Sequence, residues 1–168
     1  MSTSSNTCRI ALAGPEDAAA VAALYRLAAS SPGSAWCEEY PTANEAENDA
    51  ARGALYCLWG EDGSLWGAAT AGDPDEDARD LPCWDPSAQN PCELCRVGIR
   101  PDLQGKGLAK RLVSYVLEDV KRRGRDSVRL LVSPENPAAS ALYPKLGFVL
   151  VGSCRLYDTD WHCEELRL

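Results

Sequence analysis

Apolar residues in the first half of the chain fall into short runs separated by turn residues. Residues 8–13 predict a strand, and the alanine- and leucine-rich stretch at 15–30 predicts a helix with proline in its first turn. A short polar helix is expected at about 44–52. The β-leaning runs at 55–59 and 65–71 flank a turn with two glycines, which predicts a hairpin.

The second half of the chain follows a strand–helix–strand order with short links. Residues 92–99 predict a strand. Apolar residues then recur at steps of three and four, as expected for a helix that lies on a sheet, at Ala109, Leu112, Val113, Val116 and Val120. Residues 127–133 predict the next strand, so we expect a right-handed crossover between parallel neighbours. A short helix at 136–148 and a closing antiparallel pair complete an α/β fold with a mixed sheet.

Two connecting segments lack this periodicity. Residues 31–43 are rich in turn formers and are expected to form a lid or connector. Residues 72–91 are acidic and proline-rich and predict a loop. Loops of roughly 20 residues inside a compact domain are uncommon and are usually functional or disordered.

Composition narrows the class of protein. A chain of 168 residues with 45% hydrophobic residues fits one domain, residues 1–168, in which we expect residues 1–7 to be disordered. The formal net charge of -8 argues against nucleic acid as a partner. The N-terminus lacks the pattern of a secretory signal and no segment is long enough to span a membrane, so we expect a cytoplasmic protein without a membrane partner. The sequence leaves open whether it is a monomer or homodimer.

The segment at 100–112, RPDLQGKGLAKRL, is basic within this acidic chain and leads into the amphipathic helix. The start of a helix offers unpaired N–H groups and a partial positive charge, and Gly105 and Gly107 let an anion approach the backbone closely. This pattern predicts a diphosphate site at 104–110. The segment does not match the dinucleotide-binding fingerprint, because Lys110 stands where the last glycine is required. It does not match the phosphate-loop motif either. The alternative is a helix start with a solvated basic face.

A second motif begins thirty-two residues after Gln104, with the sequence NPAASALYPKLGF. At this spacing, QGKGLA and NPAASALYPKLGF resemble the GNAT superfamily of acyl-CoA-dependent N-acetyltransferases. The first motif matches at Gln104, Gly107 and Ala109, and the second at Asn136, Ala139, Leu142, Tyr143, Lys145, Gly147 and Phe148. The sequences WCEEYP at 36–41 and CEELRL at the C-terminus are similar to a bacterial subgroup of that family whose acceptor we do not identify.

The resemblance implies a mostly antiparallel sheet of seven or so strands whose fourth and fifth strands splay apart, with flanking helices. It also implies acetyl-CoA as cofactor, with its pantetheine arm paired to the free edge of the fourth strand and the acetyl oxygen facing the N–H of Ile99. The residues implied in cofactor binding are Val97, Ile99, Gln104, Gly105, Lys106, Gly107, Leu108, Ala109, Lys110 and Asn136. For Asn136, a role as helix cap before Pro137 is an equal alternative.

The resemblance further implies two catalytic residues. Glu93 corresponds to a glutamate that often acts as general base, and Tyr143 to a tyrosine that protonates the departing thiolate. The structural alternatives are an edge carboxylate in a surface ion pair for Glu93 and a core aromatic for Tyr143. Pro144 deprives the carbonyl of Ser140 of its helical partner and restricts the backbone of Tyr143.

The amine acceptor, a small molecule or a peptide, is expected to enter opposite the cofactor arm. The acceptor contacts expected by analogy and loop placement are Trp36, Glu38, Glu39, Tyr40, Trp84 and Asp85. Aromatic faces and carboxylates can hold a cation there. Equally, the tryptophans can belong to the core.

The eight cysteines are expected to be free thiols in a chain without an export signal. On a strand, Cys92 and Cys95 point to opposite faces about 10 Å apart, so they do not share one zinc ion, and we expect no metal site. The leading hypothesis is an acetyl-CoA-dependent N-acetyltransferase that transfers acetyl directly to a primary amine in a ternary complex. The alternative is a non-catalytic acyl-CoA-binding or regulatory module with the same fold.

Overall fold

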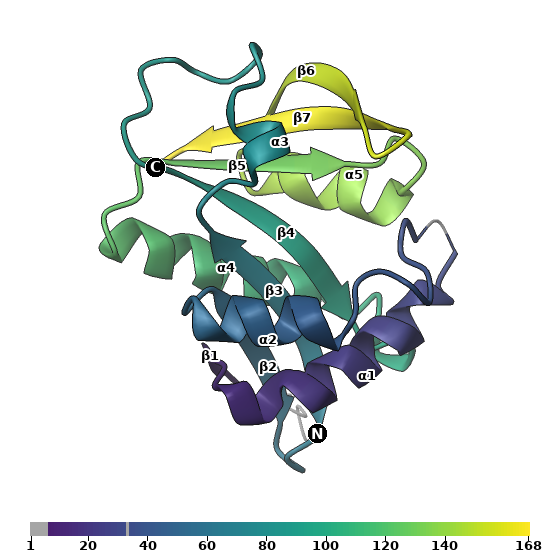
Figure 1. Cartoon of the computed structure of the whole chain (residues 1–168). Coiled ribbons are helices and arrows are strands. Elements are labelled where there is room, and N and C mark those ends of the chain that lie inside the picture. The colour runs from purple at the N-terminus through teal and green to yellow at the C-terminus, as the bar shows by residue number, and fades with distance from the viewer. Residues whose placement is uncertain (1–6, 33) are drawn as a thin grey trace, which may run out of the picture.

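A computed structural model describes residues 7–32 and 34–168 as one mixed sheet flanked by helices (Figure 1). The strands are β1 (Cys8–Leu12), β2 (Leu55–Gly60), β3 (Leu65–Gly72), β4 (Pro91–Ile99), β5 (Ser127–Val132), β6 (Val149–Leu156) and β7 (Thr159–Arg167). The α-helices are α1 (Ala18–Ala29), α2 (Ala43–Ala51), α3 (Glu76–Arg79), α4 (Leu108–Arg122) and α5 (Pro137–Lys145). Apart from Thr7, the expected disordered segment at 1–7 lies outside the described residues.

The seven strands are ordered β1-β2-β3-β4-β5-β7-β6. All neighbours are antiparallel except β4 and β5, which run parallel as the crossover pattern predicts. Their pairing is confined to Pro91–Glu93 and Ser127–Arg129, after which the two strands diverge, as Figure 1 shows. The expected α/β fold with splayed fourth and fifth strands is therefore confirmed.

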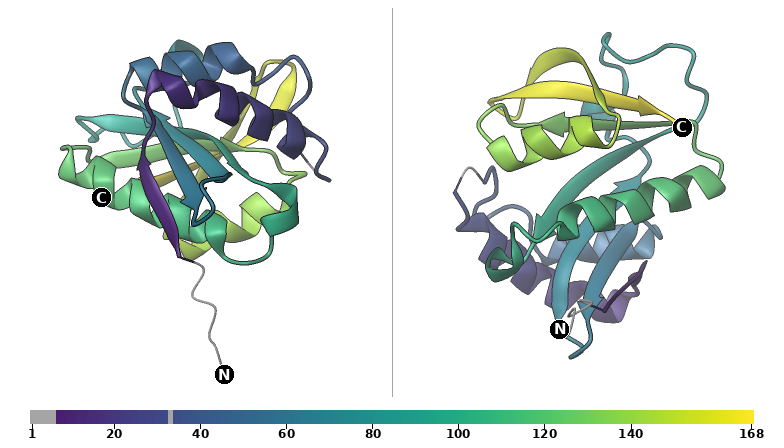
Figure 2. Two further views of the ribbon diagram at one scale, coloured as in Figure 1. Left: turned by 90° about the horizontal axis from the view of Figure 1, so that it is seen from below. Right: turned by 180° about the vertical axis from the view of Figure 1, so that it is seen from behind.

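Helices cover both faces of the sheet, as the two views in Figure 2 show. Alternation along β2 explains the arrangement, because successive side chains of a strand point to opposite faces. Leu55 and Cys57 belong to a core with α1 and α2, whereas Tyr56 and Leu58 belong to the core that includes α4 and α5. The two helices that carry the sequence motifs, α4 and α5, therefore cover the same face of the sheet.

Local sequence sets the ends of the shorter helices. Thr42 caps α2 and forms a reciprocal capping box with Glu45, which fixes the start of this polar helix. The segment at 72–91, expected to be a loop throughout, contains the single turn α3, because the side chain of Asp75 accepts a hydrogen bond from the backbone N–H of Asp77. The expectation of a wholly irregular segment is therefore wrong at this turn.

The described part of the chain contains no helix long and apolar enough to cross a membrane.

Candidate functional site

The edge of β4 that faces the splay is open beyond the short pairing with β5. On its other side, the N–H of Arg100 donates to the carbonyl oxygen of Trp66 at 2.8 Å, and Gly67 pairs with Ile99 in the same register. In an antiparallel ladder the backbone groups of neighbouring residues face opposite sides, so those of Ile99 point toward the splay. The strand thus offers main-chain hydrogen-bonding groups along an open edge.

The glycine-rich segment lies directly after β4. Gly105 and Gly107 adopt φ values of 79° and 78°, in the left-handed region that favours glycine, and Gly107 is the N-cap of α4. Apart from each glycine and its neighbours in the chain, no heavy atom of the described residues lies within 4 Å of the place where a Cβ of either glycine would stand. The backbone at the start of this 15-residue helix is therefore accessible to an anion, with the exposed Lys106 and Lys110 beside it.

Gln104 connects this segment to the open edge. Its Nε2 donates to the carbonyl oxygen of Ile99 at 3.3 Å and to Oγ of Ser31 at 3.4 Å. Residues 104–110, which we call the anion cradle, and the β4 edge are thus adjacent parts of one surface, as the sequence motifs lead us to expect. The contact of each residue with a cofactor stays a prediction.

Helix α5 carries the second motif. The side chain of Asn136 accepts a hydrogen bond from the N–H of Ala139 at 3.2 Å, so it caps the helix. Pro144 does not end α5, which continues to Lys145. Past it, the N–H groups of Leu146 and Phe148 both donate to the carbonyl oxygen of Tyr143, at 3.0 and 3.1 Å.

Tyr143 is only 7% exposed and belongs to the core formed with α4 and β5. Burial raises the pKa of its phenol, and the nearby groups of Glu164 and Cys95 raise it further. The phenol is therefore protonated at neutral pH. It can act as a proton donor to a group that enters the splay.

Glu93 lies where β4 and β5 still pair, opposite Arg129. Its carboxylate accepts a hydrogen bond at 2.8 Å from the backbone N–H of Asp75, in the segment that precedes α3. Burial raises the pKa of this carboxyl group, and the charges of Arg96 and Arg52 lower it less. A carboxylate with a raised pKa is a stronger base than an exposed one.

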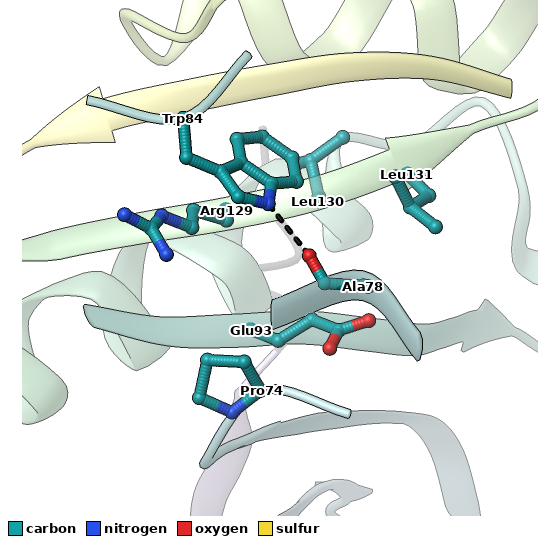
Figure 3. Close-up of a pocket in the computed structure, with 7 residues that line it drawn as sticks. All are labelled: Pro74, Ala78, Trp84, Glu93, Arg129, Leu130 and Leu131. Carbon is teal, nitrogen blue, oxygen red and sulfur yellow. Dashed lines mark hydrogen bonds between the residues drawn. The ribbon is translucent and has the colours of Figure 1, made fainter. Parts of the chain in front are cut away.

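Glu93 also lines a small pocket between α3, β4 and β5, shown in Figure 3. Trp84 closes this pocket: its Nε1 donates to the carbonyl oxygen of Ala78 at 2.7 Å, and its ring lies 5.4 Å from the guanidinium carbon of Arg129. Arg129 in turn pairs with Glu165 at 3.3 Å. Trp84 is thus a buried packing residue of the acidic segment, with its one donor already used.

The other expected acceptor residues do not all converge. Trp36 and Tyr40 contact β4, whereas Glu38 and Glu39 are exposed. Asp85 pairs with Arg167 at 3.6 Å, at the far end of β7. Of the predicted set, Trp36 and Tyr40 therefore lie against β4, and their contact with an acceptor stays a prediction.

Sequence reasoning missed a polar network that joins β4 to α2. Arg96 and Asp49 form an ion pair at 2.8 Å across 47 residues of sequence. The available signal was that Asp49 lies three residues after Ala46 and just before Ala50, on the buried face of α2. A carboxylate on the buried face of a helix indicates a buried cationic partner.

The two thiols of β4 are not activated. Burial raises the pKa of the Cys92 thiol to about 11 and that of the Cys95 thiol to about 12. Such a thiol stays protonated at neutral pH and is a weak nucleophile. Over 7–32 and 34–168, no group of three or more histidine, cysteine, aspartate or glutamate side chains is arranged to hold a metal ion.

Curated acetyltransferases are similar to part of this chain. The mycothiol acetyltransferase of Streptomyces coelicolor is 40% identical over 68 residues, which make up 40% of this chain and 22% of that protein. The mycothiol acetyltransferase of Paenarthrobacter aurescens is 44% identical over 68 residues, or 40% of this chain and 19% of that protein. This chain thus matches about a fifth of the length of these curated relatives.

Solved structures share the fold over almost the whole chain. A GNAT-family acetyltransferase from Streptococcus agalactiae aligns with a TM-score of 0.79 at 21% identity, covering 96% of this chain and 95% of that one. The PaiA N-acetyltransferase from Thermoplasma acidophilum, solved in complex with coenzyme A, aligns with a TM-score of 0.73 at 18% identity, covering 96% and 99%. Residues 21–148 match the family model described as the acetyltransferase (GNAT) family. The chain therefore belongs to the GNAT family of acetyltransferases.

Proposed function

We propose that this protein is an acetyl-CoA-dependent N-acetyltransferase that transfers an acetyl group to a primary amine of a small molecule or peptide. The observation that carries the proposal is the open edge of β4, which has an anion cradle at one end and the buried phenol of Tyr143 beside it. A non-catalytic binding module would need the cradle and the edge but no proton donor.

The residues present fit acetyl-CoA. The pyrophosphate would lie at the exposed backbone of Gly105 and Gly107 and the start of α4, with Lys106 and Lys110 as counter-charges. The pantetheine arm would then run along the open edge of β4 as an added strand, bonded to backbone groups of Ile99 and Val97. Bound in this way, the cofactor supplies an acetyl thioester at the narrow end of the splay.

This path revises the expected position of the acetyl group. Ile99 is hydrogen-bonded to Gln104 of the cradle, so it lies near the pyrophosphate end. Cys95, whose thiol influences the pKa of Tyr143, is about 13 Å further along the strand at 3.3 Å per residue. We therefore assign the acetyl oxygen to the N–H of Val97 rather than to that of Ile99.

The chemistry needs three groups. Glu93, directly or through water, removes a proton from the alkylammonium acceptor, whose pKa of about 10 keeps it protonated at neutral pH. The free amine attacks the thioester carbonyl, and the N–H of Val97 stabilises the negative charge on the oxygen. When the carbon–sulfur bond breaks, Tyr143 gives its proton to the thiolate, and the second proton that the amine nitrogen loses as it becomes an amide returns to the phenol through solvent.

Direct transfer is favoured over a covalent enzyme intermediate. Cys95 is the thiol beside this path, and its raised pKa leaves little thiolate at neutral pH. The acceptor therefore binds together with the acetyl donor. The similarity to mycothiol acetyltransferases over about 40% of the chain supports acetyl transfer, although the acceptor of this chain is not fixed by it.

The proposal is tested by incubating the purified chain with acetyl-CoA and a panel of amines that includes amino sugars, polyamines, amino acids and peptides. Release of free thiol and the mass of the acetylated product are measured. Amine-dependent release with a mass gain of one acetyl group supports the proposal. Tight acetyl-CoA binding with no product from any amine supports a non-catalytic module instead.

A further inference from the structure

Strand β4 has a bulge at Arg96. The register between β3 and β4 shifts between Ala68 and Thr70, and Arg96 adopts a φ of 49°, a left-handed conformation that is unfavourable for a side chain with a Cβ. Bulges often redirect one side chain, and a strained residue persists only where surrounding contacts hold it. The contacts of Arg96 therefore show what this bulge does.

The guanidinium of Arg96 is fixed by two elements. Its Nε and Nη2 donate to the two carboxylate oxygens of Asp49 on α2, at 2.8 and 2.9 Å. Its Nη1 donates to the hydroxyl of Tyr40, at 2.9 Å. The same carboxylate accepts hydrogen bonds from Thr70 and Arg52, both at 2.7 Å. Arg96 thus connects the bulge to the segment between α1 and α2.

The anchor of this contact is rigid. Asp49 is 1% exposed, and although burial would raise its pKa, the hydrogen bonds and charge of Arg96 hold the pKa below its usual range. The carboxylate therefore stays ionised at neutral pH and keeps the fork of Arg96 in one orientation. Tyr40, by contrast, is 44% exposed.

A second contact holds the segment between α1 and α2 against β4. The ring of Trp36 lies over Gly98, where an added Cβ would come within 2.8 Å of it, and meets Tyr25 edge-on with ring centroids 5.2 Å apart. Segment 36–40 is therefore held against residues 96–98. These residues include Val97, the position to which we assign the acetyl oxygen.

We propose that Arg96 is a positioning residue that sets acceptor specificity, because it holds Tyr40 and segment 36–40 as the wall of the acceptor site beside the acetyl group. This inference rests on the proposed function. Arg96 itself is bonded to Asp49 and Tyr40, so it acts through Tyr40 and does not touch the reacting atoms. An amine that reaches the thioester packs against the exposed ring of Tyr40.

Two conservative variants test the contact between Arg96 and Tyr40. Tyr40→Phe removes only the hydroxyl that Arg96 binds, and Arg96→Lys keeps the charge but loses the bidentate fork. Each is expected to raise the KM for the amine about tenfold, while kcat and the dissociation constant of acetyl-CoA change less than about twofold. The double variant is expected to be no worse than Arg96→Lys alone, because the contact with Tyr40 is already lost in that variant.

Matched controls are Tyr115→Phe and Arg122→Lys on α4, which remove equivalent groups away from the wall and are expected to leave all three constants unchanged. Hydrogen exchange gives a readout independent of activity. The N–H groups of Cys37 and Tyr40 donate to each other's carbonyl oxygens at 2.9 and 3.3 Å. Arg96→Lys is expected to speed their exchange at least about fivefold without changing exchange in β5.

Unchanged amine KM in both variants, or additive effects in the double variant, would overturn the role of Arg96 in acceptor binding. Unchanged exchange at Cys37 and Tyr40 would overturn the clamp itself, whatever the activity. If the unmodified protein binds acetyl-CoA but acetylates no amine, the proposed function fails and the specificity role with it, while the exchange result still decides whether the clamp exists.

Discussion

Tyr143 meets Phe148 edge-on, with ring centroids 5.5 Å apart and ring planes at 67°. The contact ties the end of α5 to the residue that precedes β6, and it is reinforced by the hydrogen bond from the N–H of Phe148 to the carbonyl oxygen of Tyr143. The phenol is therefore held in place although Pro144 follows it in the helix. A fixed, protonated phenol beside the open edge of β4 can serve as the acid of acetyl transfer.

Tyr143→Phe is expected to lower kcat about a hundredfold and to leave acetyl-CoA binding unchanged, because it removes the proton donor and keeps the ring contact with Phe148. Steady-state kinetics and calorimetric titration with acetyl-CoA measure the two quantities. Tyr115→Phe is the control. Unchanged turnover in the Tyr143 variant would remove this residue from the mechanism.

Glu93→Gln tests the base. In the unmodified protein the rate should rise with pH as the carboxyl group loses its proton, and burial places this rise above the usual pKa of glutamate. The glutamine variant lacks the rise in rate that is due to this carboxyl group. Its amine substrate must lose the proton to water instead, so the profile of rate against pH shifts to higher pH. A profile of kcat/KM against pH that is the same for both proteins would rule out Glu93 as the base.

Gly107→Ala tests the anion cradle. At a φ of 78° an alanine costs about 1 to 2 kcal/mol in stability, and it places a methyl group where the pyrophosphate approaches. Gly63→Ala is a matched control, because Gly63 has a φ of 80° in the β2–β3 turn and open space around its Cβ position. Both variants should melt at similarly reduced temperatures, but only Gly107→Ala should bind acetyl-CoA more weakly. Equal acetyl-CoA affinity in the two variants would contradict the cradle.

Glu164 should make the protein less stable as pH rises. It is 6% exposed, one of its oxygens has no hydrogen-bond partner among the described residues, and burial raises its pKa more than His162 lowers it. A raised pKa means that the folded state favours the protonated form. That stability is complete below the unfolded pKa of about 4.3 and is lost as pH rises through the folded pKa.

Glu164→Gln removes this titration, so its melting temperature relative to that of the unmodified protein should increase between about pH 4 and pH 7. Glu118→Gln, an exposed change on α4, is the control and should show no such trend. A difference in melting temperature that is constant with pH would show that Glu164 does not titrate in this range.

Local and periodic signals predicted most of the fold. The glycines of the β2–β3 turn placed both strands to within a residue or two, and the strand–helix–strand order around α4 predicted the parallel pairing of β4 and β5. The glycine-rich motif and α5 were placed correctly because each is a contiguous stretch. Strand alternation and helical periodicity involve residues that are close in the sequence, so a single sequence is enough to detect them.

The acceptor side was less predictable because its parts meet only in three dimensions. The bulge at Arg96 depends on a carboxylate 47 residues earlier, and the burial of Trp84 depends on Arg129 of β5. Placing Trp84 and Asp85 beside the acceptor rested on loop position. In the structure Asp85 pairs with Arg167, and a contact of either residue with an acceptor stays a prediction. Long-range ion pairs leave no periodic trace, so composition indicated the residue types but not their partners.

The most direct test of the account is the melting temperature of the chain with and without excess acetyl-CoA. A ligand at about a hundred times its dissociation constant adds roughly 2.7 kcal/mol of stability, which for a domain of this size raises the melting temperature by about 5 to 10 °C. We predict this rise for the unmodified chain and a much smaller rise for Gly107→Ala. No rise at millimolar acetyl-CoA would contradict the account, and the segment at 100–112 would then be a helix start with a solvated basic face.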